Sequence, residues 1–206
     1  MILTTSCQVL NIGDKMISIF IEDLDSYAYR LGAPKWLSPI MLFLYPATWS
    51  IGVYRFGNWV TKKINVPIAR QLFFIVYFFF KRLTEILTGI EIAHNADIGK
   101  GLFIGHLGGV IIVHSTLIGK NASFHEGVTI GGGGRGEKHG SPTIGDNVYF
   151  GAGAKVIGKI NIGSNVMIGA NAVVAKDVPD NAVVVGVPAK VISYEGSRDF
   201  VHYRCK

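Results

Sequence analysis

The chain has 206 residues, of which 49% are hydrophobic and 17% charged, and its formal net charge is +6. This composition excludes an intrinsically disordered chain and supplies enough apolar side chains for one sizeable core. The two cysteines, Cys7 and Cys205, stand at opposite ends of the sequence, so neither a disulfide framework nor a cysteine-based metal site is expected.

Residues 1–88 are predicted to form a helical region with a basic surface. No Asp or Glu occurs from residue 26 to residue 84, whereas the same stretch contains eight Lys and Arg residues. Aromatic and apolar helix faces flanked only by basic charge are typical of helices that lie in an anionic membrane surface. The alternative is a helical oligomerisation region whose aromatic side chains are buried against a partner subunit.

Two apolar stretches of this region are candidates for membrane spans. Residues 36–54 are uncharged but contain Pro39 and Pro46, and the stretch LFFIVYFFF at residues 72–80 has only nine residues. A spanning helix needs about 20 apolar residues, so we expect neither stretch to cross a bilayer. Residues 1–10 also lack the features of a cleavable leader. We therefore expect a cytoplasmic protein that lies at the inner face of the cell membrane.

From Ile92 onward, apolar residues recur every six positions and are mostly followed by Gly or Ala. They stand at Ile92, Ile98, Ile104, Val110, Ile118, Phe124, Ile130, Ile144, Phe150, Val156, Ile162, Ile168 and Val174. The series is shifted by two residues after Val110 and interrupted by a glycine-rich insertion after Ile130. A six-residue repeat predicts a triangular solenoid of about 18 residues per coil, with the apolar residue inside and the small residue at the corner. A glycine-rich β-sandwich would instead need apolar residues at every second position.

Three sequence motifs in the repeat region resemble a known family. They are GIEIAHNADIGKGLFIGHLGGVIIVHSTLIGKNASFHEGVTIGGGG, FGAGAKVIGKINIGSNVMIGANAVVAKDVP and GVPAKVI. Together they resemble the hexapeptide-repeat acyltransferases, namely serine acetyltransferase and, more closely, the O-acetyltransferases of polysaccharide biosynthesis. The resemblance covers roughly residues 88–192.

This resemblance implies a mainly β fold, a left-handed parallel β-helix over residues 89–192. The α-helical region of residues 1–88 precedes it and a tail of residues 193–206 follows. The family also implies acetyl-CoA as co-substrate and a homotrimer, or a dimer of trimers, with active sites between the prisms. Neither a metal nor a nucleic-acid partner is expected.

His106 occupies the position that this family uses for its general base. A histidine side chain titrates near neutral pH, so it is able to take the proton of a hydroxyl that attacks a thioester and return it to the departing thiolate. Glu91 stands where the family places a carboxylate that orients this histidine, although the family's usual residue is Asp. Fifteen residues separate the two, close to one coil, which permits contact between adjacent coils. The alternative for His106 is a solvated turn histidine.

The glycine-rich loop GGGGRGEKHGSP, residues 131–142, interrupts the repeat between Ile130 and Ile144. An insertion in so regular a solenoid is more often functional than not. In the family this loop leans over the active site of the neighbouring subunit and carries a second histidine after a basic residue. His139 and Lys138 match that pair, although two extra residues follow the histidine here. We expect an acceptor-binding or oxyanion role for His139, the alternative being a solvated loop histidine. The backbone N–H groups of Gly131 and Gly132 are candidates for stabilising the oxyanion or holding the thioester carbonyl.

Coenzyme A in this family runs along the groove between adjacent prisms and touches the backbone at small residues. Ala152 and Ala170 match such positions, Lys190 in GVPAK is placed to meet phosphate, and Lys176 is a further phosphate candidate. Because the fold needs small residues at its corners anyway, a purely structural role is an equal alternative for the two alanines.

Gly105 departs from serine acetyltransferases, in which the residue before the catalytic histidine is an aspartate that binds the amino group of serine. Without that carboxylate, the substrate ammonium loses a charge-assisted hydrogen bond of about 1.5–3 kcal/mol. We therefore predict an acetyl-CoA-dependent O-acetyltransferase that modifies a hydroxyl of a sugar or lipid-linked glycan in polysaccharide biosynthesis. The alternative is a serine O-acetyltransferase of cysteine biosynthesis.

Three further histidines of the repeat region, His94, His114 and His125, leave other functions open. Some hexapeptide proteins bind zinc through three histidines at a subunit interface, but the spacing here does not resemble that motif, so a zinc-dependent hydratase is not favoured. A non-enzymatic scaffold is a third alternative, against which His106 and the inserted loop argue.

Overall fold

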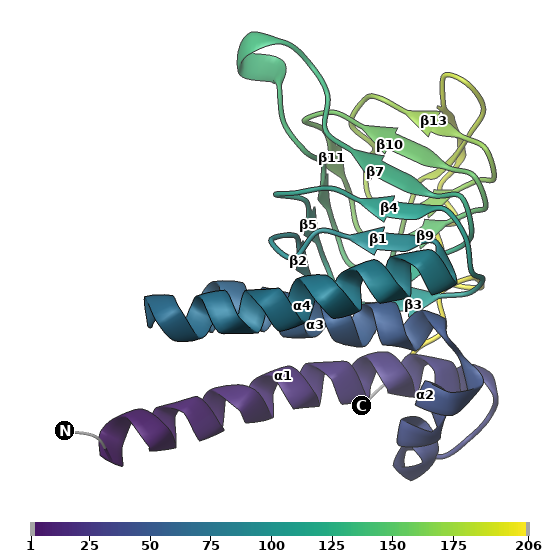
Figure 1. Cartoon of the computed structure of the whole chain (residues 1–206). Coiled ribbons are helices and arrows are strands. Elements are labelled where there is room, and N and C mark those ends of the chain that lie inside the picture. Colours follow the sequence, from purple (N-terminus) through teal and green to yellow (C-terminus); the bar gives the residue numbers. More distant parts are fainter. Residues whose placement is uncertain (1–2, 205–206) are drawn as a thin grey trace.

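The computed structural model describes residues 3–204, except the side chains of residues 3–15 and of Lys138. Cys205 and the side chain of Cys7 therefore fall outside the described part. The first half is a layer of helices (Figure 1). The helices are α1 (Leu3–Arg30), the 3-10 helix η1 (Lys35–Ile40), α2 (Met41–Leu44), α3 (Ala47–Lys63) and α4 (Pro67–Thr88). Pro67 begins α4, and Gly89 ends it in the left-handed conformation, with φ of 67°.

The second half is a parallel β-solenoid with three faces. The five-stranded sheet has the order β1-β4-β7-β10-β13, the four-stranded sheet β11-β8-β5-β2, and the six-stranded sheet β15-β14-β12-β9-β6-β3. The strands are β1 (Ile90–Ile92), β2 (Asp97–Ile98), β3 (Phe103–Ile104), β4 (Val110–Ile112), β5 (Leu117–Ile118), β6 (Ser123–Phe124), β7 (Thr129–Gly131), β8 (Thr143–Ile144), β9 (Tyr149–Phe150), β10 (Lys155–Ile157), β11 (Asn161–Ile162), β12 (Met167–Ile168), β13 (Val173–Val174), β14 (Val183–Val185) and β15 (Lys190–Ser193). The prediction of a hexapeptide-repeat, left-handed β-helix with an N-terminal helical region is confirmed.

The inward positions of successive coils stack in register. In the six-stranded sheet, Ile104 pairs with Phe124, Phe124 with Phe150, and Phe150 with Ile168, and all four side chains are fully buried. The Phe124 and Phe150 rings lie parallel, with centroids 4.4 Å apart. Stacking of this kind explains why every sixth residue must be apolar.

The two-residue shift in the repeat lies one turn earlier than the sequence pattern indicated. Ile112, two residues beyond the expected Val110, pairs with Ile92 below it and Ile130 above it. The extra residues therefore belong to the turn before β4, where Gly108 and Gly109 have φ of 104° and 69°. Only glycine adopts such angles readily, so these two residues allow a wider corner immediately after His106.

The helical layer caps the first coil of the solenoid. The Tyr27 hydroxyl donates to the carbonyl of Ile104 and accepts from its N–H group, both at 3.0 Å. The Tyr54 hydroxyl makes the same pair of contacts, donating to the Ala96 carbonyl at 3.0 Å and accepting from the Ile98 N–H group at 3.1 Å. Side chains of the helices thus satisfy the free edges of β2 and β3, which are the terminal strands of their sheets.

A buried ion pair lies at the same junction. Arg55 of α3 contacts Asp23 of α1 through two hydrogen bonds of 2.8 and 3.0 Å, and both side chains are almost fully buried. Arg55 also donates to the carbonyl of Gly99 at 2.7 Å, and Asp23 accepts from the N–H group of Leu102 at 2.9 Å. These contacts fix two helices to the turn between β2 and β3.

A ladder of asparagines follows one corner of the prism. Asn121, Asn147, Asn165 and Asn181 adopt positive φ angles of 56–59°. Each of the first three side-chain amides donates to the side-chain oxygen of the next asparagine, at 2.8, 2.9 and 3.2 Å. Asparagine tolerates this backbone conformation better than most residues, so the ladder supports the turns between the four-stranded and six-stranded sheets.

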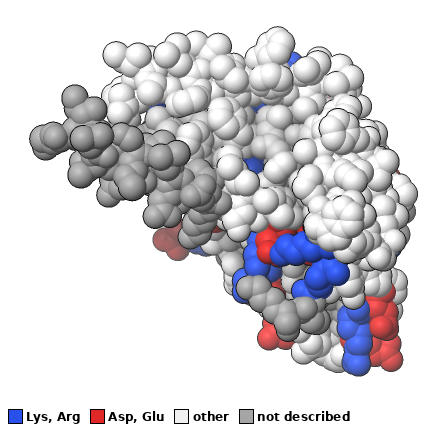
Figure 2. Space-filling view, turned by 90° about the horizontal axis from the view of Figure 1, so that it is seen from below, with Lys and Arg blue, Asp and Glu red and all other residues white. Residues whose placement is uncertain are grey.

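The outer face of α4 is apolar and exposed. Its exposed large hydrophobic residues are Ile68, Leu72, Phe73, Ile75, Val76, Phe78, Phe79, Phe80, Leu83, Ile86 and Leu87. Figure 2, which views the molecule from below, shows a mainly uncharged surface with charged side chains grouped along one edge. No single described helix has the length and apolar composition of a membrane span. Residues 35–44 and 47–63 meet those criteria only together, as a pair bent by 105°.

The C-terminal tail returns to the helical layer. Strand β15 runs antiparallel to β14 and ends the six-stranded sheet. Beyond it, Val201 is buried, and Arg204 contacts Asp25 of α1 at 3.2 Å. The tail therefore connects the last coil with the helices beneath the first coil.

Candidate functional site

The corner between the six-stranded and five-stranded sheets brings the candidate catalytic residues together. His106 lies in the turn after β3, and the equivalent turns of the next coils follow β6, β9 and β12. Backbone hydrogen bonds from Gly105 to Phe124 (2.8 Å) and from His125 to Phe150 (3.1 Å) hold these turns in register. By this register, the corner position of His106 corresponds to Glu126 in the second coil, Ala152 in the third and Ala170 in the fourth.

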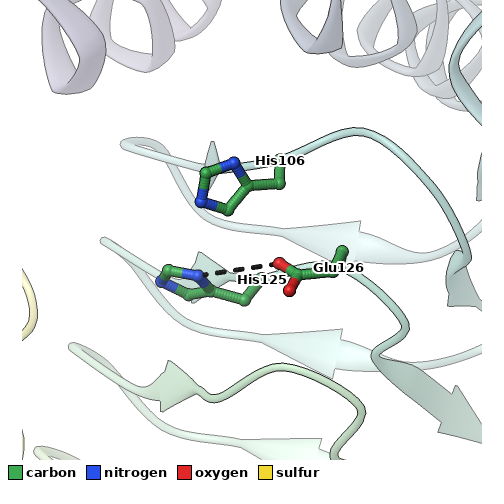
Figure 3. A group of neighbouring side chains, drawn as sticks. All are labelled: His106, His125 and Glu126. Carbon is green, nitrogen blue, oxygen red and sulfur yellow. Dashed lines mark ion pairs between the residues drawn. The ribbon is translucent and has the colours of Figure 1, made fainter.

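His106, His125 and Glu126 form a compact cluster at the end of this corner nearest the helices (Figure 3). One nitrogen of each ring and one carboxylate oxygen lie within 4.8 Å of one another. The ring centroids of the two histidines are 5.7 Å apart, and Nδ1 of His125 lies 3.9 Å from Oε2 of Glu126. His106 is exposed, whereas His125 and Glu126 are partly buried.

Burial tunes the second histidine. Desolvation lowers the pKa of His125, and the nearby His106 and Arg30 lower it further, while Glu126 acts in the opposite direction. The His125 ring also lies 5.1 Å from the ring of Tyr149. His125 is therefore favoured as a neutral imidazole beside the more exposed His106.

Gly105 leaves room next to this cluster. A Cβ atom at this position would lie 3.2 Å from the Phe103 ring and 3.5 Å from Cε1 of His125. The small residue before His106 therefore places the ring of His125, from the next coil, against the backbone of the first.

Glu91, the predicted orienting carboxylate, does not contact His106 in this chain. It lies on β1, with an exposed side chain whose Oε1 is 3.7 Å from Nζ of Lys81. It pairs across the sheet with Ile111, because one coil at this level contains 20 residues and not 15. The carboxylate that approaches His106 is that of Glu126, and the orienting role of Glu91 stays a prediction.

The inserted loop lies at a different corner, between the five-stranded and four-stranded sheets. It projects from the prism as an extended hairpin (Figure 1), closed by two 3.0 Å hydrogen bonds between Gly133 and Gly140. Gly131 is buried at the end of β7, and Gly132 and His139 are exposed. The side chain of Lys138 lies outside the described residues. Within one chain, His139 and His106 therefore belong to different corners, and their predicted cooperation requires a second subunit.

The residues predicted to bind coenzyme A divide between the corners. Ala152, partly buried, and Ala170, exposed, continue the corner that begins with His106. Lys176 is exposed in the turn after β13, at the corner of the inserted loop, and Lys190 is exposed at the start of β15. The path of the cofactor across these positions stays a prediction.

The cluster has the donor atoms of a metal site. Two imidazoles and one carboxylate form the ligand set that zinc uses in several hydrolases. The other two candidate histidines are engaged differently, since Nδ1 of His94 lies 2.9 Å from the Thr61 hydroxyl and Nδ1 of His114 lies 2.7 Å from Oδ1 of Asn95. The expectation of an enzyme without a metal stays a prediction.

Sequence reasoning did not identify Glu126, although a signal for it exists. Pairing of Ile104 with Phe124 sets a coil of 20 residues, and 20 residues after His106 is Glu126. The repeat series itself contains this spacing, because Ile104 and Phe124 are three repeat positions and 20 residues apart.

The chain is similar to a family model and to curated proteins. Residues 141–176 match the model described as bacterial transferase hexapeptide (six repeats). The chain is 42% identical over 155 residues to a serine acetyltransferase of Helicobacter pylori. The aligned residues make up 74% of the chain and 85% of that protein. It is also 42% identical to a serine acetyltransferase of Mycobacterium tuberculosis, over 154 residues that make up 74% of the chain. The chain spans only 63% of the length of that second relative.

Solved structures give the same similarity. The Neisseria gonorrhoeae serine acetyltransferase in complex with serine is 30% identical, with a TM-score of 0.72 over 87% of this chain and 70% of that one. A serine acetyltransferase in complex with CoA is 27% identical, with a TM-score of 0.70 over 87% of this chain and 70% of that one. The likeness therefore includes the helical layer as well as the β-helix.

Proposed function

Because the chain belongs to the serine acetyltransferase family, we propose that it transfers the acetyl group of acetyl-CoA to the hydroxyl of serine. The observation that carries this proposal is the corner at which exposed His106 begins a column that continues into Ala152 and Ala170. In this column Glu126 lies between His106 and the two alanines. A base and a carboxylate at one end and small residues at the other suit a hydroxyl acceptor beside an extended thioester cofactor.

The expectation of a sugar or lipid-linked glycan acceptor in polysaccharide biosynthesis is wrong. It was drawn from Gly105 and from the basic, apolar N-terminal region. Curated relatives that are 39–50% identical are serine acetyltransferases, which favours the alternative acceptor. The lack of a side chain at position 105 therefore does not exclude an amino-acid acceptor.

The proposed chemistry is a direct acyl transfer. His106 takes the proton of the serine hydroxyl as its oxygen attacks the thioester carbonyl carbon. The tetrahedral oxyanion then collapses, the carbon–sulfur bond breaks, and the imidazolium returns the proton to the coenzyme A thiolate. Gly131, Gly132 and His139 remain candidates for stabilising the oxyanion, through groups that a neighbouring subunit would supply.

A homotrimer is part of this proposal. The corner of His106 and the loop of His139 lie apart in one chain, and a threefold arrangement of prisms would place the loop of one subunit beside the corner of the next. Molar mass in solution, measured by light scattering, tests this assembly.

Contact with an anionic membrane surface also stays a proposal. The exposed apolar face of α4 supports it. Five of the eight basic residues that suggested it are paired with carboxylates, namely Lys35, Arg55, Lys62, Lys81 and Arg82. The attraction to anionic lipid would therefore depend on the other three.

The test of the enzymatic proposal is release of free thiol from acetyl-CoA by the purified full chain with serine as acceptor. We expect saturable turnover, and we expect His106→Ala to lower kcat by at least about 100-fold, the usual contribution of a general base. His202→Ala is the matched control, since His202 is also exposed but lies in the C-terminal tail. Turnover with other hydroxyl acceptors but not with serine would refute the proposed substrate, and a His106→Ala variant with more than about a tenth of wild-type activity would refute the base.

A further inference from the structure

The carboxylate of Glu126 has acceptor capacity that the described residues do not use. Its oxygen Oε2 is buried and has no hydrogen-bond partner among the described residues. The closest basic nitrogen, Nδ1 of His125, is 3.9 Å away, which is too long for a hydrogen bond. Leaving a buried charged acceptor without a donor is unfavourable. Because Oε2 is closed to solvent, a ligand that brings its own donor would reach this carboxylate through the exposed part of the side chain.

The side chain is also open toward the corner. Its exposed fraction is 46%, and Glu126 follows His106 by one coil in the register of the corner. One of its oxygens lies within 4.8 Å of a His106 nitrogen. Any small molecule whose hydroxyl reaches His106 therefore has a negative charge beside it.

Serine matches this spacing. Its hydroxyl oxygen and its ammonium nitrogen are separated by three covalent bonds, and each would form a hydrogen bond of about 2.8 Å. When the two hydrogen bonds lie at an angle to each other, they span a ring nitrogen of His106 and a carboxylate oxygen of Glu126 that are within 4.8 Å of one another. An ammonium group has three N–H donors to offer the carboxylate.

We propose that Glu126 binds the ammonium group of the amino-acid acceptor and thereby selects amino acids over other alcohols. This inference rests on the proposed serine acetyltransferase function and assigns it a specificity-determining residue. Binding occurs by a charge-assisted hydrogen bond in a corner partly screened from water, where such bonds are stronger than neutral ones.

The other acidic candidates near His106 do not fulfil this role in the described chain. Glu91 lies on β1 beside Lys81, and Gly105 has no side chain. Space for a carboxylate at position 105 is limited by the Phe103 ring, 3.2 Å from a Cβ atom built there. The next coil therefore supplies the acid that the first coil lacks.

The experiment compares steady-state kinetics of the full chain and of Glu126→Gln, which keeps the size of the side chain and removes its charge. We expect the KM for serine to rise about 10- to 100-fold, as for loss of a charged hydrogen bond. The KM for acetyl-CoA should change less than about twofold. Glu126→Asp should give an intermediate KM for serine, and Glu195→Gln, which removes an exposed charge in the tail, should behave as wild type.

A second readout uses 3-hydroxypropanoate, which has the hydroxyl and carboxylate of serine but no ammonium group. The wild type should prefer serine to 3-hydroxypropanoate. This preference, measured as the ratio of the two kcat/KM values, should be at least about tenfold smaller in Glu126→Gln. Each assay is run with and without a chelator, because His106, His125 and Glu126 are also able to bind a metal ion. If the wild type does not acetylate serine, the proposed function itself fails. If it does, three results would overturn the inference. The first is a KM for serine in Glu126→Gln within threefold of the wild-type value, and the second is an unchanged preference for serine over 3-hydroxypropanoate. The third is loss of saturation by serine when the chelator is added.

Discussion

Replacing Tyr27 or Tyr54 by phenylalanine should destabilise the fold to different extents. Each substitution keeps the buried ring and removes one hydroxyl. Tyr27→Phe leaves both the N–H and the carbonyl of Ile104 without the contacts they make to the hydroxyl. Tyr54→Phe leaves the N–H of Ile98 without its partner, but the Ala96 carbonyl keeps a 2.7 Å hydrogen bond from Asn58.

The magnitudes follow from this count. A buried backbone group without a partner costs about 1–3 kcal/mol. The free energy of unfolding should therefore fall by about 1–3 kcal/mol in Tyr54→Phe and by about 2–6 kcal/mol in Tyr27→Phe. Burial raises the pKa of Tyr54 to about 12 and raises that of Tyr27 as well, so both hydroxyls are protonated donors at neutral pH.

Urea unfolding followed by tryptophan fluorescence measures the difference, because Trp36, Trp49 and Trp59 all belong to the helical layer. Protein concentration must be the same for all variants, since association contributes to apparent stability. Equal losses in the two variants, or a larger loss in Tyr54→Phe, would show that these hydroxyls do not satisfy the first coil as described.

Three further predictions concern the corner and the helical layer. Ala170→Trp should raise the KM for acetyl-CoA at least about tenfold without changing the far-UV circular dichroism spectrum, and an unchanged KM would remove Ala170 from the cofactor path. Burial lowers the pKa of His125 in the folded chain, so the unfolded state binds more protons at this residue below about pH 6.5. Stability should therefore fall as the pH is lowered from 7 to 5, and urea unfolding of His125→Gln should show a smaller fall than wild type. The full chain should co-float with anionic liposomes at low salt, and Ile75→Glu with Phe79→Glu should abolish co-flotation; flotation equal to wild type would refute membrane contact through α4.

The repeat made the solenoid predictable because each coil uses the same local rule. An apolar residue every six positions fixes which side chains point inward, as the stack from Ile104 through Phe124 to Phe150 illustrates. The rule fails where the chain departs from it. The wide turn at Gly108 and Gly109 adds two residues before β4. A count in sixes instead places these two residues after Val110.

The site was predictable only in part, for the same reason. His106 was found by its motif, whereas the proximity of Glu126 depends on the length of one particular coil. The contacts of Tyr27 with Ile104 join residues 77 positions apart, and no local pattern in the sequence encodes them. The asparagine ladder has a local signal, a residue that tolerates positive φ at each equivalent corner, but its side-chain hydrogen bonds appear only once the coils are stacked.

The capped first coil has a consequence for assembly. A β-solenoid with an open end presents unpaired strands to which the end of another solenoid is able to add, and repetition of that contact would generate fibres. On β2 and β3, the hydroxyls of Tyr27 and Tyr54 occupy such groups before another chain reaches them. The helical layer thus terminates growth of the sheets, and a fragment that began at Ile90 would be prone to head-to-tail polymerisation.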